Sequence, residues 1–300
     1  MRCSGGHEAH LSCIFGMPFT APLNAGAGRT RGNTYMNFNL PSHLANDYRT
    51  FGFTVLRQFF DPRPLAAEID QVMHDGLVAS VSRAGETQFQ YVPMMVAKTP
   101  VSLSLLDRLE VVAADLLGGS VLPTRAKGVR FSGNTPWHTD SASPLASVGC
   151  LAYLERLGAN DGALRVLPGS QHLDFRDALR GLRVEGMAVP SLPAHVVKTE
   201  PGDLILLDEH LFHSSFGGGT RRQWRVDFVN APVGAEAEDL TKSYFAGIYP
   251  LDWDGGYDVD RYPSYGADWR SSSHPFVAQL EALGVYELAA AQEAFTRSRR

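Results

Sequence analysis

The chain has 300 residues, of which 44% are hydrophobic, enough for one large domain with a well-filled core or for two small domains. Its formal net charge of −5 and the absence of a clustered basic stripe argue against a nucleic-acid partner. Three scattered cysteines are too few for a disulfide framework or a thiolate metal site, so we expect a protein of a reducing compartment.

The N-terminal residues 1–35 are rich in Gly, Ala and Thr, and we expect them to form a disordered leader. The apolar run LSCIFGMPF (11–19) is short, is interrupted by Pro18 and follows little positive charge, unlike a signal peptide. No apolar run approaches the roughly 20 residues that span a bilayer. The sequence therefore predicts a cytoplasmic protein with a single domain over residues 36–300.

The first part of this domain, residues 40–120, has mainly helical character. The stretch 44–60 predicts a short helix that runs into a strand. The stretch 61–77 predicts a helix with Asp61 as its N-cap. The stretch 101–119 predicts another, because leucine and valine recur at helical spacing before two glycines end it. We expect the apolar stripes of these helices to pack on the core.

Residues 121–232 change to short apolar strands separated by Gly- and Pro-containing turns. The expected strands are 127–132, 147–154, 163–167, 194–199, 203–208, 211–216 and 222–230. Many short strands with regular turns predict a β-barrel or sandwich. The expected fold is therefore mainly β with flanking α-helices, closed by a C-terminal lid and helix over residues 233–300.

The motif PWHTD places His138 and Asp140 two residues apart in a polar run. A His-x-Asp pair alone is a weak signal, but His213 begins a polar strand after the apolar strand LILLD and can supply a third ligand. Two histidines and one carboxylate are the facial triad typical of Fe(II) oxygenases. His210 is the rival third ligand, although three residues earlier on an extended strand it points to the opposite face.

Several separated blocks resemble one enzyme family. They are NTPWHTD (134–140), DGALRVLPGSQH (161–172), EPGDLILLDEHLFHSS (200–215) and RRQWRVDF (221–228). Their order and spacing over about residues 44–230 are similar to those of phytanoyl-CoA dioxygenase-like (PhyH) enzymes. The resemblance implies a double-stranded β-helix, a jelly-roll or cupin-like barrel, with Fe(II), 2-oxoglutarate and O2. By this likeness His138, Asp140 and His213 are the metal-binding and catalytic residues.

A cation is expected to hold the distal carboxylate of 2-oxoglutarate. Arg221 and Arg225 share the face of their strand that looks into the barrel, whereas Arg222 has the opposite parity. Arg221 matches the family position best, by the Trp three and the Phe seven residues later. The preceding loop is shorter than usual, so Arg225 stays a competitor. Thr135 and Trp137 flank the metal ligands and are expected to touch the co-substrate or substrate.

The resemblance implies a 2-oxoglutarate-dependent dioxygenase that oxidises, and most simply hydroxylates, a small-molecule metabolite of specialised biosynthesis, with succinate and CO2 as co-products. The carboxylate of Asp140 argues against halogenation, because related halogenases carry a small residue there. Two alternatives are a zinc metallohydrolase that uses the same three ligands and a non-catalytic barrel that serves as a binding module.

The aromatic and acidic stretch 249–269 is expected to form part of the pocket rim. Asp252, Trp253 and Asp254 within it suit an amine-bearing substrate, through charge pairing and cation–π contact. The alternative is a solvated acidic loop whose aromatic residues pack on the barrel. Lys127 and Arg130, on the strand before the metal motif, are further cations that could anchor a substrate, and the alternative for each is a solvated surface charge.

Overall fold

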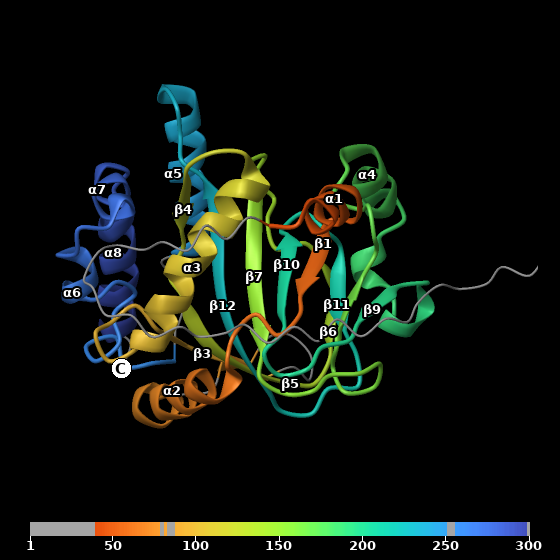
Figure 1. Cartoon of the computed structure of the whole chain (residues 1–300), viewed down its shortest axis with the longest axis horizontal. Coiled ribbons are helices and arrows are strands. Elements are labelled where there is room, and N and C mark those ends of the chain that lie inside the picture. The colour runs from red at the N-terminus through yellow and green to blue at the C-terminus, as the bar shows by residue number, and fades with distance from the viewer. Residues whose placement is uncertain (1–39, 79–80, 83–87, 251–255, 299–300) are drawn as a thin grey trace, which may run out of the picture. The chain divides into compact units, whose positions relative to one another are not determined.

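The computed structural model describes residues 40–78, 81–82, 88–250 and 256–298. The expected leader lies outside these residues. Two antiparallel sheets occupy the middle of the described structure, with helices around them (Figure 1). None of the helices in the described residues has the length and apolar character needed to span a bilayer.

The larger sheet has eight strands in the order β1-β10-β7-β12-β5-β3-β2, and β4 pairs with the end of β12. Their bounds are β1 Phe53–Leu56, β2 Val81–Ser82, β3 Gln88–Pro93, β4 Val121–Pro123, β5 Lys127–Ser132, β7 Ser147–Tyr153, β10 Leu204–Asp208 and β12 Arg221–Asn230. The smaller sheet has four strands in the order β6-β11-β8-β9. Their bounds are β6 Thr135–His138, β8 Leu164–Val166, β9 His195–Val197 and β11 His213–Ser215.

The helices lie on the outside of these sheets. Their bounds are α1 Ser42–Phe51, α2 Pro62–Gly76, α3 Pro100–Leu117, α4 Leu173–Gly181, α5 Ala235–Ile248, α6 Ala267–Arg270, α7 Pro275–Ala282 and α8 Val285–Ser298. Helices α2 and α3 pack on the outer face of the larger sheet, against β12 and its neighbours (Figure 1). The predicted N-cap of α2 is confirmed, since the Asp61 carboxylate accepts a hydrogen bond from the backbone N–H of Arg63 at 3.1 Å.

The prediction of β strands with flanking helices is confirmed. The described strands pair into two sheets, however, and not into the predicted closed barrel. No backbone ladder among the described residues joins β6, β8, β9 or β11 to a strand of the larger sheet. The chain leaves the larger sheet after β5 at Gly133, whose φ of +83° favours glycine. The next strand, β6, then pairs with β11 in the smaller sheet. The two sheets are therefore separate, with the site between them.

The long strand β12 divides its side chains between two environments, as its alternating sequence predicts. Arg221, Gln223, Arg225 and Asp227 line the cavity between the sheets. Trp224 points the other way and is fully buried against α3, where its indole N–H donates to the hydroxyl of Ser102 at 2.7 Å. The polar face of β12 thus meets the site and its apolar face meets the helices.

We expect Ser102→Ala to lower the free energy of unfolding by about 1–3 kcal/mol, because it leaves a buried indole N–H without a partner. Chemical denaturation followed by tryptophan fluorescence measures this change. The matched control is Ser104→Ala on the exposed side of the same helix, which should change stability by less than about 0.5 kcal/mol. Equal effects of the two substitutions would contradict this account of how the helix is anchored.

Candidate metal centre

His138, Asp140 and His213 come together at one end of the smaller sheet. His138 ends β6 and pairs in register with His213, the first residue of β11. The Nε2 atom of His138 lies 3.5 Å from one carboxylate oxygen of Asp140, and the Nε2 atom of His213 lies 3.4 Å from the other. One ligand atom from each of the three residues lies within 4.8 Å of the other two, a spacing that suits one metal ion.

The two imidazoles are held so that the same ring nitrogen of each faces the centre. The Nδ1 atom of His138 is 2.8 Å from the carbonyl oxygen of Pro136, and that of His213 is 2.9 Å from the carbonyl oxygen of Leu211. An N–H on Nδ1 that donates to a carbonyl leaves the lone pair on Nε2. The rings therefore present two nitrogen ligands beside a carboxylate, the donor set that suits Fe(II).

The charge states of Asp140 and His213 also suit a cation. Burial alone would raise the pKa of Asp140, but Arg225 and the two histidines outweigh it and hold the pKa well below its ordinary value. Burial lowers the pKa of His213 to about 4, despite the opposing effect of Asp140. At neutral pH the site thus contains an ionised carboxylate and an uncharged His213, as metal ligation requires.

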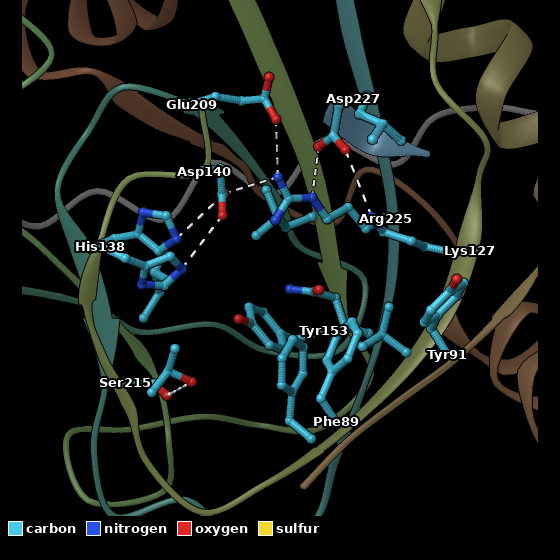
Figure 2. A pocket seen from close by; sticks show the side chains of 18 of the residues that line it. Phe89, Tyr91, Lys127, His138, Asp140, Tyr153, Glu209, Ser215, Arg225 and Asp227 are labelled. Carbon is cyan, nitrogen blue, oxygen red and sulfur yellow. Dashed lines mark hydrogen bonds and ion pairs between the residues drawn. The ribbon is translucent and has the colours of Figure 1, made fainter. Parts of the chain in front are cut away.

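Arg225 is surrounded by carboxylates. Its Nη2 atom lies 2.9 Å from Asp140 and 3.4 Å from Glu209, and its Nε–H donates to Asp227 at 2.6 Å. Figure 2 shows this chain of contacts running along the cavity wall from the triad. Arg225 is therefore occupied as the partner of a candidate metal ligand and of two neighbouring acids.

Arg221 has a different environment. It is buried, with 2% of its surface exposed, and it forms no ion pair with a carboxylate of the described residues. Its guanidinium donates to the hydroxyl of Ser215 at 2.7 Å and to the carbonyl of Gly133 at 3.1 Å, while its Nε–H has no partner. A Cβ on Gly162 would lie 3.0 Å from the guanidinium carbon, so glycine leaves room for this side chain.

The triad and Arg221 line the same cavity, which has a volume of about 310 Å³. Thr135 lines it as well, and its hydroxyl accepts a hydrogen bond from Ser215 at 3.1 Å. Apolar residues from both sheets, including Leu151 and Leu164, complete the wall. A cavity of this size with a few convergent polar groups is typical of small-molecule sites.

Other residues singled out in the sequence lie elsewhere. Trp137 is buried on the opposite face of β6, in a separate apolar cluster with Phe212, because side chains alternate along a strand. Arg130 does not line the cavity for the same reason, whereas its strand neighbours Val129 and Phe131 do. The imidazole of His210 lies between the Asp208 carboxylate at 3.0 Å and the carbonyl of Ser143 at 2.6 Å, away from the triad.

The C-terminal stretch 249–269 contributes little to the cavity within the described residues. Tyr257, Tyr262 and Trp269 are buried in the main core. Asp260 forms a surface ion pair with Arg297 at 2.7 Å. The expected substrate contacts Asp252, Trp253 and Asp254 lie outside the described residues.

Several lining residues were not predicted. Phe89 and Tyr91 of β3 line the cavity, and their alternation with glutamines in QFQYVP is a period-two signal that identifies a strand. Glu209 and Tyr244 also line it and are hydrogen-bonded to each other at 2.8 Å. Tyr244 belongs to α5, and nothing in the sequence of that helix indicates that it reaches the site.

Comparison with known proteins now identifies the family. The sequence profile of phytanoyl-CoA dioxygenase (PhyH) matches residues 48–225. The chain belongs to the phytanoyl-CoA dioxygenase family. It is a 2-oxoglutarate-dependent oxygenase, and the iron and 2-oxoglutarate on which this family depends are its cofactor and co-substrate. No curated protein sequence matches the chain.

Similar solved structures have the same fold at low sequence identity. HygX from Streptomyces hygroscopicus, solved with nickel and 2-oxoglutarate, is 20% identical with a TM-score of 0.52, over 64% of this chain and 88% of that one. AviO1 from Streptomyces viridochromogenes Tue57 is 18% identical with a TM-score of 0.51, over 65% and 96%. The α-ketoglutarate-dependent epimerase SnoN from nogalamycin biosynthesis is 17% identical with a TM-score of 0.51, over 66% and 88%.

Proposed function

We propose that this PhyH-family enzyme binds Fe(II) through His138, Asp140 and His213 and oxidises a small-molecule metabolite, most simply by hydroxylation. The observation that supports the proposal is the presence, in one cavity, of the triad and of Arg221, which has no carboxylate partner among the described residues. When bound, iron and 2-oxoglutarate activate O2 to oxidise a substrate C–H bond, with succinate and CO2 as co-products.

Arg221 is the better candidate of the two arginines for the distal carboxylate of 2-oxoglutarate. Among the described residues its Nε–H has no partner, and its hydrogen bonds go only to uncharged oxygens. A guanidinium of this kind can bind a carboxylate in bidentate geometry without first breaking an ion pair. The hydroxyls of Ser215 and Thr135 lie beside it and would help to orient the same group. Arg225, by contrast, already contacts three acids.

The remaining residues of the site would set its geometry and exclude water. Arg225 holds Asp140 ionised and fixes one of its oxygens. Apolar side chains of the two sheets shield the cavity, which strengthens the electrostatic contacts inside it. The carboxylate of Asp140 favours hydroxylation or another oxidation over halogenation. The related solved structures support assigning the two sheets to a cupin-like double-stranded β-helix. One oxygenase domain over residues 36–300 stays a proposal from the sequence.

We expect the protein to convert 2-oxoglutarate slowly to succinate in the absence of its substrate, in a reaction that needs Fe(II) and O2. Quantification of succinate by mass spectrometry measures this turnover against a control without enzyme. A chelator should abolish it, and Zn(II) should not restore it. Turnover that is supported by Zn(II), or that is independent of metal, would contradict the proposed function and favour a metallohydrolase.

A further inference from the structure

We propose that the substrate carries an anionic group, in the simplest case a carboxylate, and that Lys127 binds it. This inference rests on the proposed function and names the substrate class of the same site. Lys127 begins β5 and lines the cavity. In the sheet register it lies opposite Arg225, whereas Phe131 lies opposite Arg221. Four residues of strand separate the two positions, about 13 Å, so Lys127 is distinct from the proposed anchor of 2-oxoglutarate.

The ammonium group of Lys127 lacks a close partner. Its nearest carboxylate oxygen among the described residues belongs to Asp227, at 4.0 Å, which is too far for a hydrogen bond. Asp227 is already bound by Arg225 at 2.6 Å, and the hydroxyl of Thr124 lies 3.5 Å from its other oxygen. The Lys127 side chain is only 21% exposed. The ammonium group thus has a distant ion pair with Asp227 and no hydrogen-bond acceptor among the described residues, so an anionic ligand could supply one.

The charges that line the cavity leave room for one anion. Among the described lining residues, four cationic side chains face three carboxylates, so one positive charge is left over. The two positive charges of Fe(II) and the two negative charges of 2-oxoglutarate cancel, and this surplus therefore persists in the loaded site. A monoanionic substrate would neutralise it. The seven residues are Arg125, Lys127, Arg221, Arg225, Asp140, Glu209 and Asp227.

An amine-bearing substrate, by contrast, finds no carboxylate that is free of a cationic partner among the described lining residues. All three lining carboxylates, those of Asp140, Glu209 and Asp227, contact the guanidinium of Arg225. A cationic substrate would add a charge to a site that already has a positive surplus. The charges of the described lining residues therefore favour an anion over the amine that the acidic C-terminal stretch suggested.

The surface beside Lys127 is aromatic. Phe89 and Tyr91 on the neighbouring strand β3 line the cavity, and Phe89 packs against Phe131 with ring centroids 5.2 Å apart. Figure 2 shows Lys127 and Tyr91 on one side of the cavity and His138 on the other. A substrate with an apolar or aromatic body would lie along these rings, with its anionic end at Lys127 and a C–H bond toward the triad.

The test uses the anaerobic enzyme loaded with Fe(II) and saturating 2-oxoglutarate. Three probes share a phenyl ring on a short alkyl chain and differ in the group at its end: 3-phenylpropionate, its isosteric amide 3-phenylpropanamide, and 3-phenylpropylamine. Calorimetry gives their dissociation constants, and the visible charge-transfer band of the iron–2-oxoglutarate complex reports whether 2-oxoglutarate stays bound. We expect the carboxylate to bind at least about tenfold more tightly than the amide, and the amine to bind most weakly.

Three variants assign the effect to one side chain. Lys127→Gln should remove the preference for the carboxylate, and Lys127→Arg should retain it. Arg130→Gln is the matched control, because Arg130 lies on the same strand but does not line the cavity. The proposal would be overturned if the native protein did not prefer the carboxylate, or if the preference survived Lys127→Gln. It would also be overturned if the carboxylate bound by displacing 2-oxoglutarate. The charge-transfer band should form in all of these variants, so its loss would instead contradict the proposed function.

Discussion

Replacing His213 by alanine should lower the affinity for Fe(II) by more than about a hundredfold and abolish succinate formation. The imidazole supplies one of three protein ligands, and even residues that only support a metal ligand typically contribute 10- to 100-fold to metal affinity. Anaerobic titration with Fe(II), followed by equilibrium dialysis and metal analysis, measures the change. The free energy of unfolding of the metal-free protein should change little by comparison.

The matched control for this substitution is His210→Ala. His210 lies three residues away in the sequence, but its ring contacts Asp208 and the carbonyl of Ser143 rather than the triad. It should lower stability, because it leaves buried polar groups without partners, and leave iron affinity within about twofold. Loss of iron binding in His210→Ala with retention in His213→Ala would show that the third ligand has been assigned to the wrong histidine.

Replacing Arg221 by alanine should weaken binding of 2-oxoglutarate by about 2–4 kcal/mol, or roughly 30- to 1000-fold, because a buried carboxylate loses its charged partner. The affinity for Fe(II) alone should stay near that of the native protein, since Arg221 does not contact the triad. Titration of the iron-loaded protein with 2-oxoglutarate, monitored by its charge-transfer band, measures the dissociation constant.

Arg222→Ala is the control for the loss of an arginine on the same strand. Its side chain points away from the cavity and pairs with Glu155 and Asp70, each at 2.7 Å. Removing these half-exposed ion pairs should change stability modestly and leave 2-oxoglutarate binding unaltered. The account would be wrong if Arg221→Ala bound 2-oxoglutarate normally while Arg225→Ala lost this binding but still bound iron. In that case Arg225 would be the residue that binds the distal carboxylate of 2-oxoglutarate.

The parts of the fold with regular periodicity could be predicted from the sequence. Strand β5 has the predicted bounds 127–132, and α2 begins at its predicted N-cap, Asp61. The alternation of polar and apolar side chains along β12 correctly predicted which residues face the cavity and which face the helices. A strand that lies between a polar site and an apolar layer must have such an alternation. The same alternation, however, places Arg221 and Arg225 on one face, so it could not rank them. Their ranking depends on contacts with Ser215 and with three distant acids.

Tertiary packing decided what local patterns left open. Trp137 was expected at the site because it precedes His138, yet adjacent residues of a strand face opposite ways, and it packs in a separate apolar cluster. The aromatic residues of the C-terminal stretch resembled a binding surface, but Tyr257 and Tyr262 are among the most buried side chains of the core. The number of sheets also depends on which strands pair over long distances, and no local signal specifies that.

We expect one cavity to bind Fe(II) and 2-oxoglutarate together. The most direct test is an anaerobic titration of the metal-free protein, first with Fe(II) and then with 2-oxoglutarate, followed by visible spectroscopy. We predict a charge-transfer band that develops only when both are present, saturates at about one equivalent of iron and is absent in His213→Ala. A protein that binds zinc but forms no such band with Fe(II) and 2-oxoglutarate would contradict the assignment of this site.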